Sequence, residues 1–144
     1  VPLIRNKIKK VYVLTATSAG NTVIFGNDYL ITFDKKDQVK NVEKLHNGMI
    51  VQKISDEKTG HTISGMHSHV IKNWQAITPT DICTLMLYQK FTSWESYITV
   101  SKKFVSIWNP NNKLMIMKTD DFKGMTEDIF KNKRDKPQTD KTYK

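Results

Sequence analysis

Short runs of β-branched and aromatic residues, separated by polar turns, fill the first half of the chain. Runs of this kind are typical of β-strands, and clusters of Gly, Asn, Asp and Ser indicate where one strand folds back on the next. We expect turns at 18–21, 26–28, 34–37, 47–48 and 56–60. The strands between them are expected at 11–17, 22–25, 29–33, 39–45, 49–54 and 62–70. The pattern predicts a meander of antiparallel strands, in which 11–17 and 22–25 form the first hairpin.

A strong helix start follows the last of these strands. Thr78 suits the N-cap, Pro79 the first helical position and Asp81 the third. Apolar residues then occupy nearly every face as far as position 91, which is typical of a helix that packs on a sheet and is covered elsewhere. Strands at 97–100, 104–108 and 114–117 and a short helix near 125–130 complete the pattern. We therefore predict an α/β (α+β) fold with a mixed, mostly antiparallel sheet and a central buried helix.

Size and composition favour one domain. A chain of 144 residues, of which 38% are hydrophobic, supplies one core, so we expect a single globular domain at 1–130. Positions 131–144 carry six basic and two acidic residues, with Tyr143 as the one large apolar group, and are expected to form a basic flexible tail. No apolar run approaches the roughly 20 residues of a spanning helix, so we expect no membrane span.

The net charge and the cysteine content say little about binding partners or compartment. The formal net charge of +9 permits attraction to nucleic acid, but no basic stripe interleaved with aromatic residues supports that partner. Cys83 is the one cysteine, so no internal disulfide forms and the compartment is undecided. Because the sequence begins at Val1, we expect a longer precursor whose targeting signal cannot be read. Localisation and oligomeric state are left open.

Two histidines form the candidate chemical site. His67 and His69 stand two residues apart in a predicted strand, so both imidazoles point to the same face. Asp81 opens the following helix and can return a carboxylate to that face. Two histidines and one Asp suit zinc and leave its fourth position for water, as a hydrolase requires. Taken singly, however, Asp81 also fits a capping box, and each histidine fits a half-buried strand residue.

The same residues resemble a known signature. The sequence GMHSH at 65–69, followed by TPTD at 78–81, is similar to that of JAMM/MPN-type zinc metalloproteases, H-[ST]-H-P followed by S-x-x-D. The resemblance implies that His67, His69 and Asp81 bind zinc and that Thr78 is the counterpart of the serine that stabilises the oxyanion. It also implies a cytidine-deaminase-like α/β fold and hydrolysis of peptide or isopeptide bonds in a protein or peptide substrate.

The matched residues do not include the group that accepts a proton from the zinc-bound water. The family uses an upstream glutamate to take a proton from the zinc-bound water, and this sequence has only Glu43 and Glu57 before the histidines. Glu57 lies in a predicted turn, about 33 Å along an extended strand from His67. Folding that hairpin back brings His46 close to His69. Glu43 and His46 are therefore the better candidates, although Glu43 also fits a solvated strand residue.

Several interpretations stay open. Val70 stands where the family has proline, and Thr78 where it has serine. The leading interpretation is a zinc-dependent hydrolase of peptide or isopeptide bonds. The first alternative is a non-catalytic binding domain with a degenerate JAMM-like site. The second is a basic module that contacts nucleic acid, or a hydrolytic toxin released from a larger polypeptide. Trp74, in the loop beside the site, is either a packing residue or a cover for a substrate chain.

Overall fold

The chain folds as an α+β structure with mostly antiparallel sheets. The computed structural model describes residues 2–5, 8–56, 60–72, 74–111 and 113–134. The strands in this part of the chain are β1 (Pro2–Arg5), β2 (Ile8–Val13), β3 (Thr22–Gly26), β4 (Tyr29–Phe33), β5 (Val39–Lys44), β6 (Met49–Lys53), β7 (Ser55–Asp56), β8 (Gly60–His61), β9 (Ser64–His69), β10 (Ser96–Ser101), β11 (Phe104–Trp108) and β12 (Leu114–Lys118). The helices are α1 (Pro79–Tyr88) and α2 (Thr119–Arg134).

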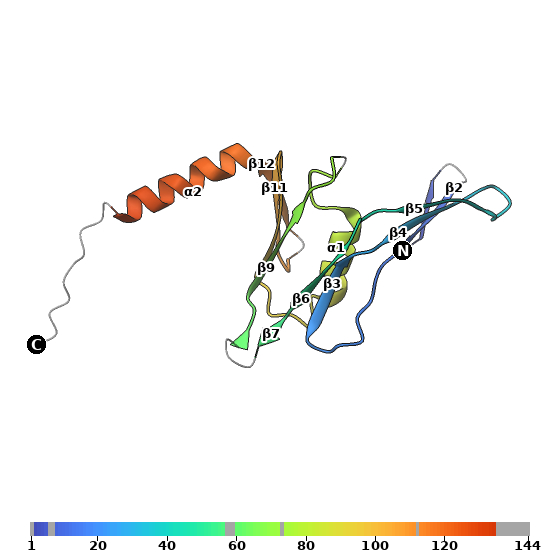
Figure 1. Cartoon of the computed structure of the whole chain (residues 1–144), viewed down its shortest axis with the longest axis horizontal. Helices are drawn as coiled ribbons and strands as arrows, with labels where there is room; N and C mark the ends of the chain where they lie inside the picture. Colours follow the sequence, from blue (N-terminus) through green and yellow to red (C-terminus); the bar gives the residue numbers. More distant parts are fainter. Residues whose placement is uncertain (1, 6–7, 57–59, 73, 112, 135–144) are drawn as a thin grey trace, which may run out of the picture.

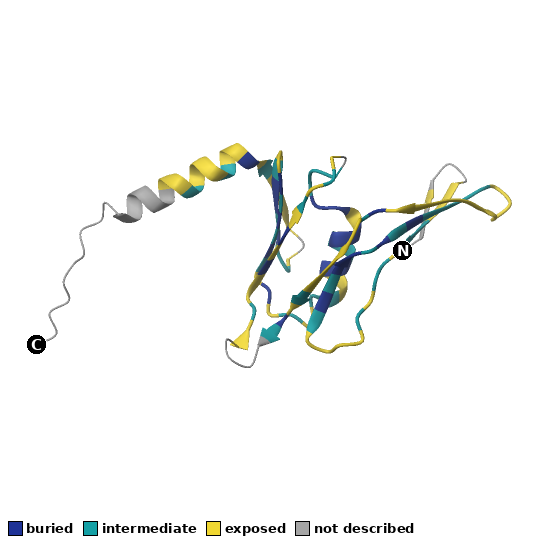
Figure 2. Cartoon of the chain, viewed as in Figure 1, coloured by how far each residue is buried: buried dark blue, intermediate teal, exposed yellow. Residues whose placement is uncertain are grey.

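A sheet in the order β1-β2-β4-β5 extends from the body of the molecule, on the right in Figure 1. All its pairs are antiparallel. The predicted hairpin across 34–37 is confirmed as β4–β5, and Asp34 Oδ1 accepts the amides of Lys36 and Gln38 to hold its turn. Every residue of β5 is exposed (Figure 2), so this sheet contributes little to the core.

A second sheet, in the order β12-β11-β10-β9, carries the predicted histidine strand at its edge. Its strand β9 pairs in parallel with β10, while β10–β11 and β11–β12 are antiparallel. The core lies where this sheet meets α1 and β3, and its buried residues are Val23, Phe25, Ile54, Ile77, Leu85, Trp94, Tyr97 and Trp108. The dark centre of Figure 2 marks this region.

The helix α1 begins where the sequence predicts and ends earlier. Thr78 is its N-cap and Pro79 its first residue, but the helix stops at Tyr88 instead of position 91. It packs against β3 through Leu85 and leaves Met86 and Leu87 exposed. The expectation of a helix covered on nearly every side is therefore wrong for its outer face.

The predicted first hairpin, between 11–17 and 22–25, is also wrong. Strand β2 pairs with β1 and β4, whereas β3 pairs with β6. The reason is burial: β3 supplies Val23 and Phe25 to the core, while β2 belongs to the exposed sheet. The predicted hairpin across 56–60 is reduced to the two-residue strands β7 and β8, because β6 and β9 take other partners.

The C-terminal helix is longer than predicted. Instead of a short helix near 125–130, α2 runs from Thr119 to Arg134 and projects from the end of β12 (Figure 1). The expected tail from position 131 therefore begins inside this helix, and 135–144 lie outside the described residues. Cys83 is half-buried on α1. Neither described helix combines the length and apolar character needed to cross a membrane.

Candidate metal centre

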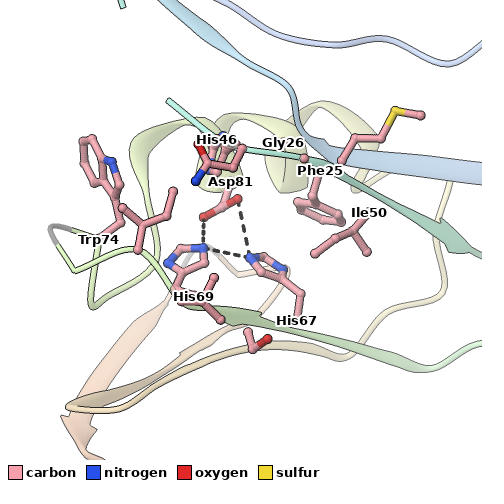
Figure 3. Close-up of a pocket in the computed structure, with 14 residues that line it drawn as sticks. Phe25, Gly26, His46, Ile50, His67, His69, Trp74 and Asp81 are labelled. Atoms are coloured by element: carbon pink, nitrogen blue, oxygen red, sulfur yellow. Dashed lines mark hydrogen bonds and ion pairs between the residues drawn. The ribbon is translucent and has the colours of Figure 1, made fainter. Parts of the chain in front are cut away.

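The structure brings His67, His69 and Asp81 together in a buried cluster (Figure 3). The Nε2 atoms of His67 and His69 are 2.9 Å apart. Asp81 Oδ2 lies 3.1 Å from His69 Nε2, and Asp81 Oδ1 lies 3.7 Å from His67 Nε2. The three side chains are almost fully shielded from solvent. Two ring nitrogens and one carboxylate thus converge on a single point.

The N-terminus of α1 positions Asp81. The Thr78 amide donates to Asp81 Oδ2 over 2.9 Å, and the Thr78 hydroxyl accepts the Asp81 amide over 3.1 Å, which completes a capping box. The same Thr78 hydroxyl donates to Asp81 Oδ2 over 2.6 Å. From the sequence, the capping role of Asp81 and its role beside the histidines stand as alternatives. The structure shows that Asp81 can do both. The cap fixes the carboxylate while Oδ1 stays directed at His67.

The parallel strand pair β9–β10 positions His67. Alternation along β9 puts His67 and His69 on one face and exposes Ser68 on the other. The buried Tyr97 hydroxyl lies 3.1 Å from His67 Nδ1. Tyr97 can reach it because its register partner is Gly65, where a Cβ would overlap the tyrosine ring. A glycine two residues before the first histidine thus seats the ring that holds this histidine.

The loop between β9 and α1 positions His69 and is itself tied to the sheet. His69 Nδ1 lies 2.9 Å from the Ala76 carbonyl, which can only accept, so Nδ1 carries the proton and Nε2 faces the cluster. The Ile77 amide donates to Ser106 Oγ over 3.1 Å. The Ser101 hydroxyl donates to the Gln75 carbonyl. These bonds fix the start of α1 relative to β9.

Burial and mutual charge shift the pKa values in the cluster. Burial lowers the pKa of His67 to about 4, despite the favourable charge of Asp81. Burial acts in the same sense on His69, but hydrogen bonding to Asp81 and the Asp81 charge outweigh it and raise the pKa. For Asp81, burial is outweighed by the hydrogen bond from His69, the His67 charge and the bonds from Thr78, so its pKa is lowered. At neutral pH the cluster therefore contains an ionised Asp81 and a neutral His67.

These donors fit a zinc ion. Zinc–nitrogen bonds of about 2.0–2.1 Å in a tetrahedral site place two ligand atoms about 3.3 Å apart. The two Nε2 atoms are 2.9 Å apart, and the distances from them to the two different Asp81 oxygens, 3.1 and 3.7 Å, lie on either side of that value. The Nδ1 atom of His67 contacts the Tyr97 hydroxyl, and the Nδ1 atom of His69 contacts the Ala76 carbonyl. Such contacts on the second ring nitrogen orient metal-binding imidazoles.

A second histidine–aspartate pair, His46 and Asp28, lies next to this cluster. His46, His69 and Asp81 each offer one potential ligand atom, and these atoms lie within 4.8 Å of one another. His46 Nδ1 is 3.5 Å from Asp28 Oδ2. Asp28 is buried, which raises its pKa despite an opposing hydrogen bond from the Thr15 amide. His46 therefore lies between two buried carboxylates.

A cavity of about 180 Å³ opens beside the cluster. His46, His67, His69 and Asp81 line its polar side. Its other walls are largely apolar, and they include Phe25, Met49, Ile50, Val70, Ile71 and Trp74. A polar cluster at the wall of an apolar cavity is the usual form of a small-molecule or substrate site.

The remaining predicted site residues lie in different places. Glu43 is exposed on β5 and does not line the cavity, so the structure does not bring it to the cluster. Glu57 lies outside the described residues. Thr78 is buried and its hydroxyl donates to the Asp81 carboxylate, which it orients, and its predicted oxyanion contact stays a prediction. Trp74 is half-buried at the cavity wall.

Sequence reasoning missed Asp28 and Tyr97. Asp28 sits in the Gly-Asn-Asp segment that predicts only a turn, and Tyr97 sits in a strand that predicts only core packing. Tyr97 reaches His67 through the parallel pair β9–β10, which local patterns do not reveal, whereas Asp28 reaches His46 at the end of the β4–β5 hairpin. The one available signal was Gly65 in a strand, because such a glycine often marks the close approach of another group.

Comparisons of the chain with protein-family models, with curated protein sequences and with solved structures found no match. The resemblance to the JAMM/MPN signature therefore stays a prediction, and the geometry of the cluster carries the functional argument.

Proposed function

We propose that the protein is a zinc-dependent hydrolase of the JAMM/MPN-like type that cleaves peptide or isopeptide bonds. The observation that carries this proposal is the convergence of His67 Nε2, His69 Nε2 and the Asp81 carboxylate at the wall of an open cavity. Each of the three groups is also held by a partner outside the cluster, namely Tyr97, Ala76 or Thr78. A merely structural cluster would have no need of the adjoining cavity.

The chain's own residues would act as follows. His67 and His69 present ring nitrogens to the ion, and Asp81 supplies the negative charge that offsets it. Tyr97, Ala76 and Thr78 orient these three groups from outside. Zinc in such a site supplies Lewis acidity, which makes water a stronger nucleophile near neutral pH and polarises a carbonyl group.

The lining of the cavity supports a peptide substrate. The cavity is open to solvent, and its apolar wall suits an apolar side chain beside the bond that is cleaved. Met49, Ile50 and Val70 are exposed at this wall, where burial against a bound chain would stabilise a complex. Trp74 offers a flat apolar surface for the same chain.

The position of Glu43 favours a second candidate, a metal-binding module without turnover. The JAMM/MPN family needs a glutamate near the ion, and Glu43 is exposed on β5. Zinc binding without hydrolysis of any peptide would favour this second candidate over the first.

The test is zinc content and peptide hydrolysis of protein purified without a chelator or a polyhistidine tag. We expect about one zinc per chain, together with hydrolysis that is abolished by a chelator and restored by zinc. His67→Ala and Asp81→Ala should lose both the metal and the activity. The matched control is His61→Ala, because His61 is exposed on β8 and should leave both unchanged. No zinc in the wild type, even after reconstitution, would overturn the proposal.

A further inference from the structure

Two turns of the chain are tied together beside the metal cluster. One contains Gly26, Asn27 and Asp28, and the other runs from Leu45 to Gly48. The Asn27 amide donates to the Gly48 carbonyl, and the Leu45 amide donates to the Asp28 carbonyl, each over 2.9 Å. Both Gly26 and Asn27 have positive φ, at 87° and 54°. This backbone frame fixes Asp28 and His46 side by side.

The frame is tight at its first residue. A Cβ on Gly26 would lie 2.5 Å from the Gly48 carbonyl oxygen, so the two turns approach as closely as glycine permits. Asp28 is held further by the Thr15 amide, which donates to its Oδ1 over 3.0 Å. The Thr15 hydroxyl donates to the Asn27 carbonyl over 2.8 Å. One oxygen of Asp28 is thus fixed, and the other faces His46.

The polar atoms that face each other here are buried and unpaired. Within the described residues, Asp28 Oδ2 and both ring nitrogens of His46 have no hydrogen-bond partner, although all three are shielded from solvent. Buried polar atoms normally have partners, and exceptions often mark a functional site. The Nδ1 atom of His46 is 3.5 Å from Asp28 Oδ2, just beyond a hydrogen bond. His46 also lines the cavity, beside His69 and Asp81 (Figure 3).

We propose that Asp28 and His46 form a carboxylate–imidazole pair in which Asp28 holds the Nδ1–H of His46, so that Nε2 accepts a proton from the attacking water. The inference rests on the proposed function. It assigns to His46 the proton transfer for which Glu43 is too remote, and it makes Asp28 a positioning residue. This assignment places His46 beside the ion, although its ring nitrogen lies near enough to His69 and Asp81 to be a ligand, and a comparison of zinc affinities separates the two roles.

The proton transfers balance for amide hydrolysis. The water oxygen bonds to the carbonyl carbon and its proton goes to His46 Nε2, while Nδ1–H stays with Asp28. The carbon–nitrogen bond then breaks, and the departing amine nitrogen takes the proton from Nε2. The products are a carboxylic acid and an amine, and His46 returns to its starting tautomer. A neighbouring carboxylate that fixes the tautomer of a catalytic imidazole is a general device.

The first test is the tautomer of His46, measured by long-range ¹H–¹⁵N correlation NMR of the histidine rings in metal-free protein. We expect the proton on Nδ1 in the wild type. Asp28→Asn should increase the Nε2–H population, because the Asn amide can donate to Nδ1. The control Asp37→Asn should leave the His46 signals unchanged, since Asp37 is exposed and pairs with Lys9. An Nε2–H tautomer in the wild type would overturn the proposal.

The second test separates a proton acceptor from a metal ligand. We expect Asp28→Asn and His46→Gln to lower kcat/KM for a peptide substrate by about 10²- to 10⁴-fold. Their zinc dissociation constants, measured by competition with a chelator, should stay within about threefold of wild type, as for the control His61→Gln. Unchanged kcat/KM, or zinc affinity that falls as far in His46→Gln as in His69→Ala, would contradict the assignment.

Failure of the proposed function is distinguishable from failure of this pair. A wild-type protein that binds zinc and hydrolyses no peptide would remove the hydrolase proposal and, with it, the catalytic role of His46. The NMR measurement would still decide whether Asp28 orients the ring, because it needs neither metal nor substrate.

Discussion

Two corners of the molecule each place a buried aspartate against an imidazole, and they differ in how completely they are bonded. The β9–α1 corner consists of His67, His69, Thr78 and Asp81. In it, Asp81 Oδ2 has three partners within 3.1 Å. The β3–β4 corner consists of the Gly26–Asp28 turn and His46. There, Asp28 Oδ2 and both His46 nitrogens lack hydrogen bonds within the described residues.

The difference suggests that one corner binds the ion and the other transfers a proton. The bonded corner is preorganised, so it can hold an ion in a fixed position without rearranging. The under-bonded corner keeps unused hydrogen-bonding capacity in a buried place, which destabilises the fold but suits a proton transfer. The pKa values agree with this contrast, because that of Asp81 is lowered and that of Asp28 is raised.

Substitution of Gly26 or Gly65 should lower the stability of the protein more than any other change predicted here. We expect Gly26→Ala to lower the free energy of unfolding by about 3 kcal/mol, because its φ is 87° and its Cβ would meet the Gly48 carbonyl. Gly65→Ala should cost about 2 kcal/mol, because its Cβ would lie 2.8 Å from Tyr97 Cδ2. Denaturant unfolding measures both. Gly20→Ala is the control, since nothing lies within 4 Å of the added atom.

The two glycine variants should also separate the corners functionally. Gly65→Ala displaces the ring that holds His67, so we expect zinc affinity to fall by about tenfold or more. Gly26→Ala should disturb His46 and leave zinc affinity nearly unchanged. Equal losses of zinc affinity in the two variants would remove the distinction between the corners.

Acid should destabilise the metal-free β9–α1 corner. The folded pKa of His67 is about 4, below the ordinary value of 6.5, so the fold favours the neutral ring. Its contribution to stability is complete above pH 6.5 and is lost as the pH falls to 4, by about 3 kcal/mol. The lowered pKa of Asp81 acts in the same direction at still lower pH, whereas the raised pKa of His69 gives a contribution that is lost as the pH rises.

The measurement is the free energy of unfolding between pH 4 and 7 for metal-free wild type and His67→Gln. The variant should show the weaker pH dependence, and His61→Gln should match the wild type. Identical slopes in wild type and His67→Gln would mean that His67 is not buried in its neutral form.

Threonine substitutions should sharpen the comparison with smaller effects. Thr78→Ala removes the N-cap and the bond to Asp81, so we expect a loss of about 1–2 kcal/mol in the free energy of unfolding and weaker zinc binding. Thr15→Ala removes one bond to the Asn27 carbonyl and should cost about 1 kcal/mol without affecting zinc. Thr78→Ser should recover most of the loss. Full zinc affinity in Thr78→Ala would show that Asp81 needs no support from the cap.

Local patterns predicted the β9–α1 corner well. The Thr-Pro-Thr-Asp start of α1 depends on neighbouring residues alone, and alternation along β9 places its two histidines on one face whatever the strand pairs with. The hairpin β4–β5 was equally local, because Asp34 holds its turn. These features could be predicted because their causes lie within a few residues in the sequence.

The β3–β4 corner could be predicted only in part, because one of its two causes is distant in the sequence. Strand β3 leaves the expected hairpin to pair with β6, since Val23 and Phe25 contribute more when buried against α1. The β4–β5 hairpin, which local patterns predict, pairs Tyr29 with Lys44 and brings Asp28 beside Leu45. The β3–β6 pairing then closes the frame through Asn27 and Gly48. Glu43, three residues before His46, is exposed on β5, and its role as a proton acceptor stays a prediction.

The most direct test of the account is zinc titration, by isothermal calorimetry, of metal-free wild type, Asp81→Asn and Asp28→Asn. Both variants replace a buried carboxylate by an amide of the same shape, so they differ only in the corner they alter. We predict one zinc per chain in the wild type, an affinity at least about 100-fold weaker in Asp81→Asn, and near wild-type affinity in Asp28→Asn. No binding by the wild type, or equal weakening in both variants, would contradict the central claim that the β9–α1 corner alone holds the metal.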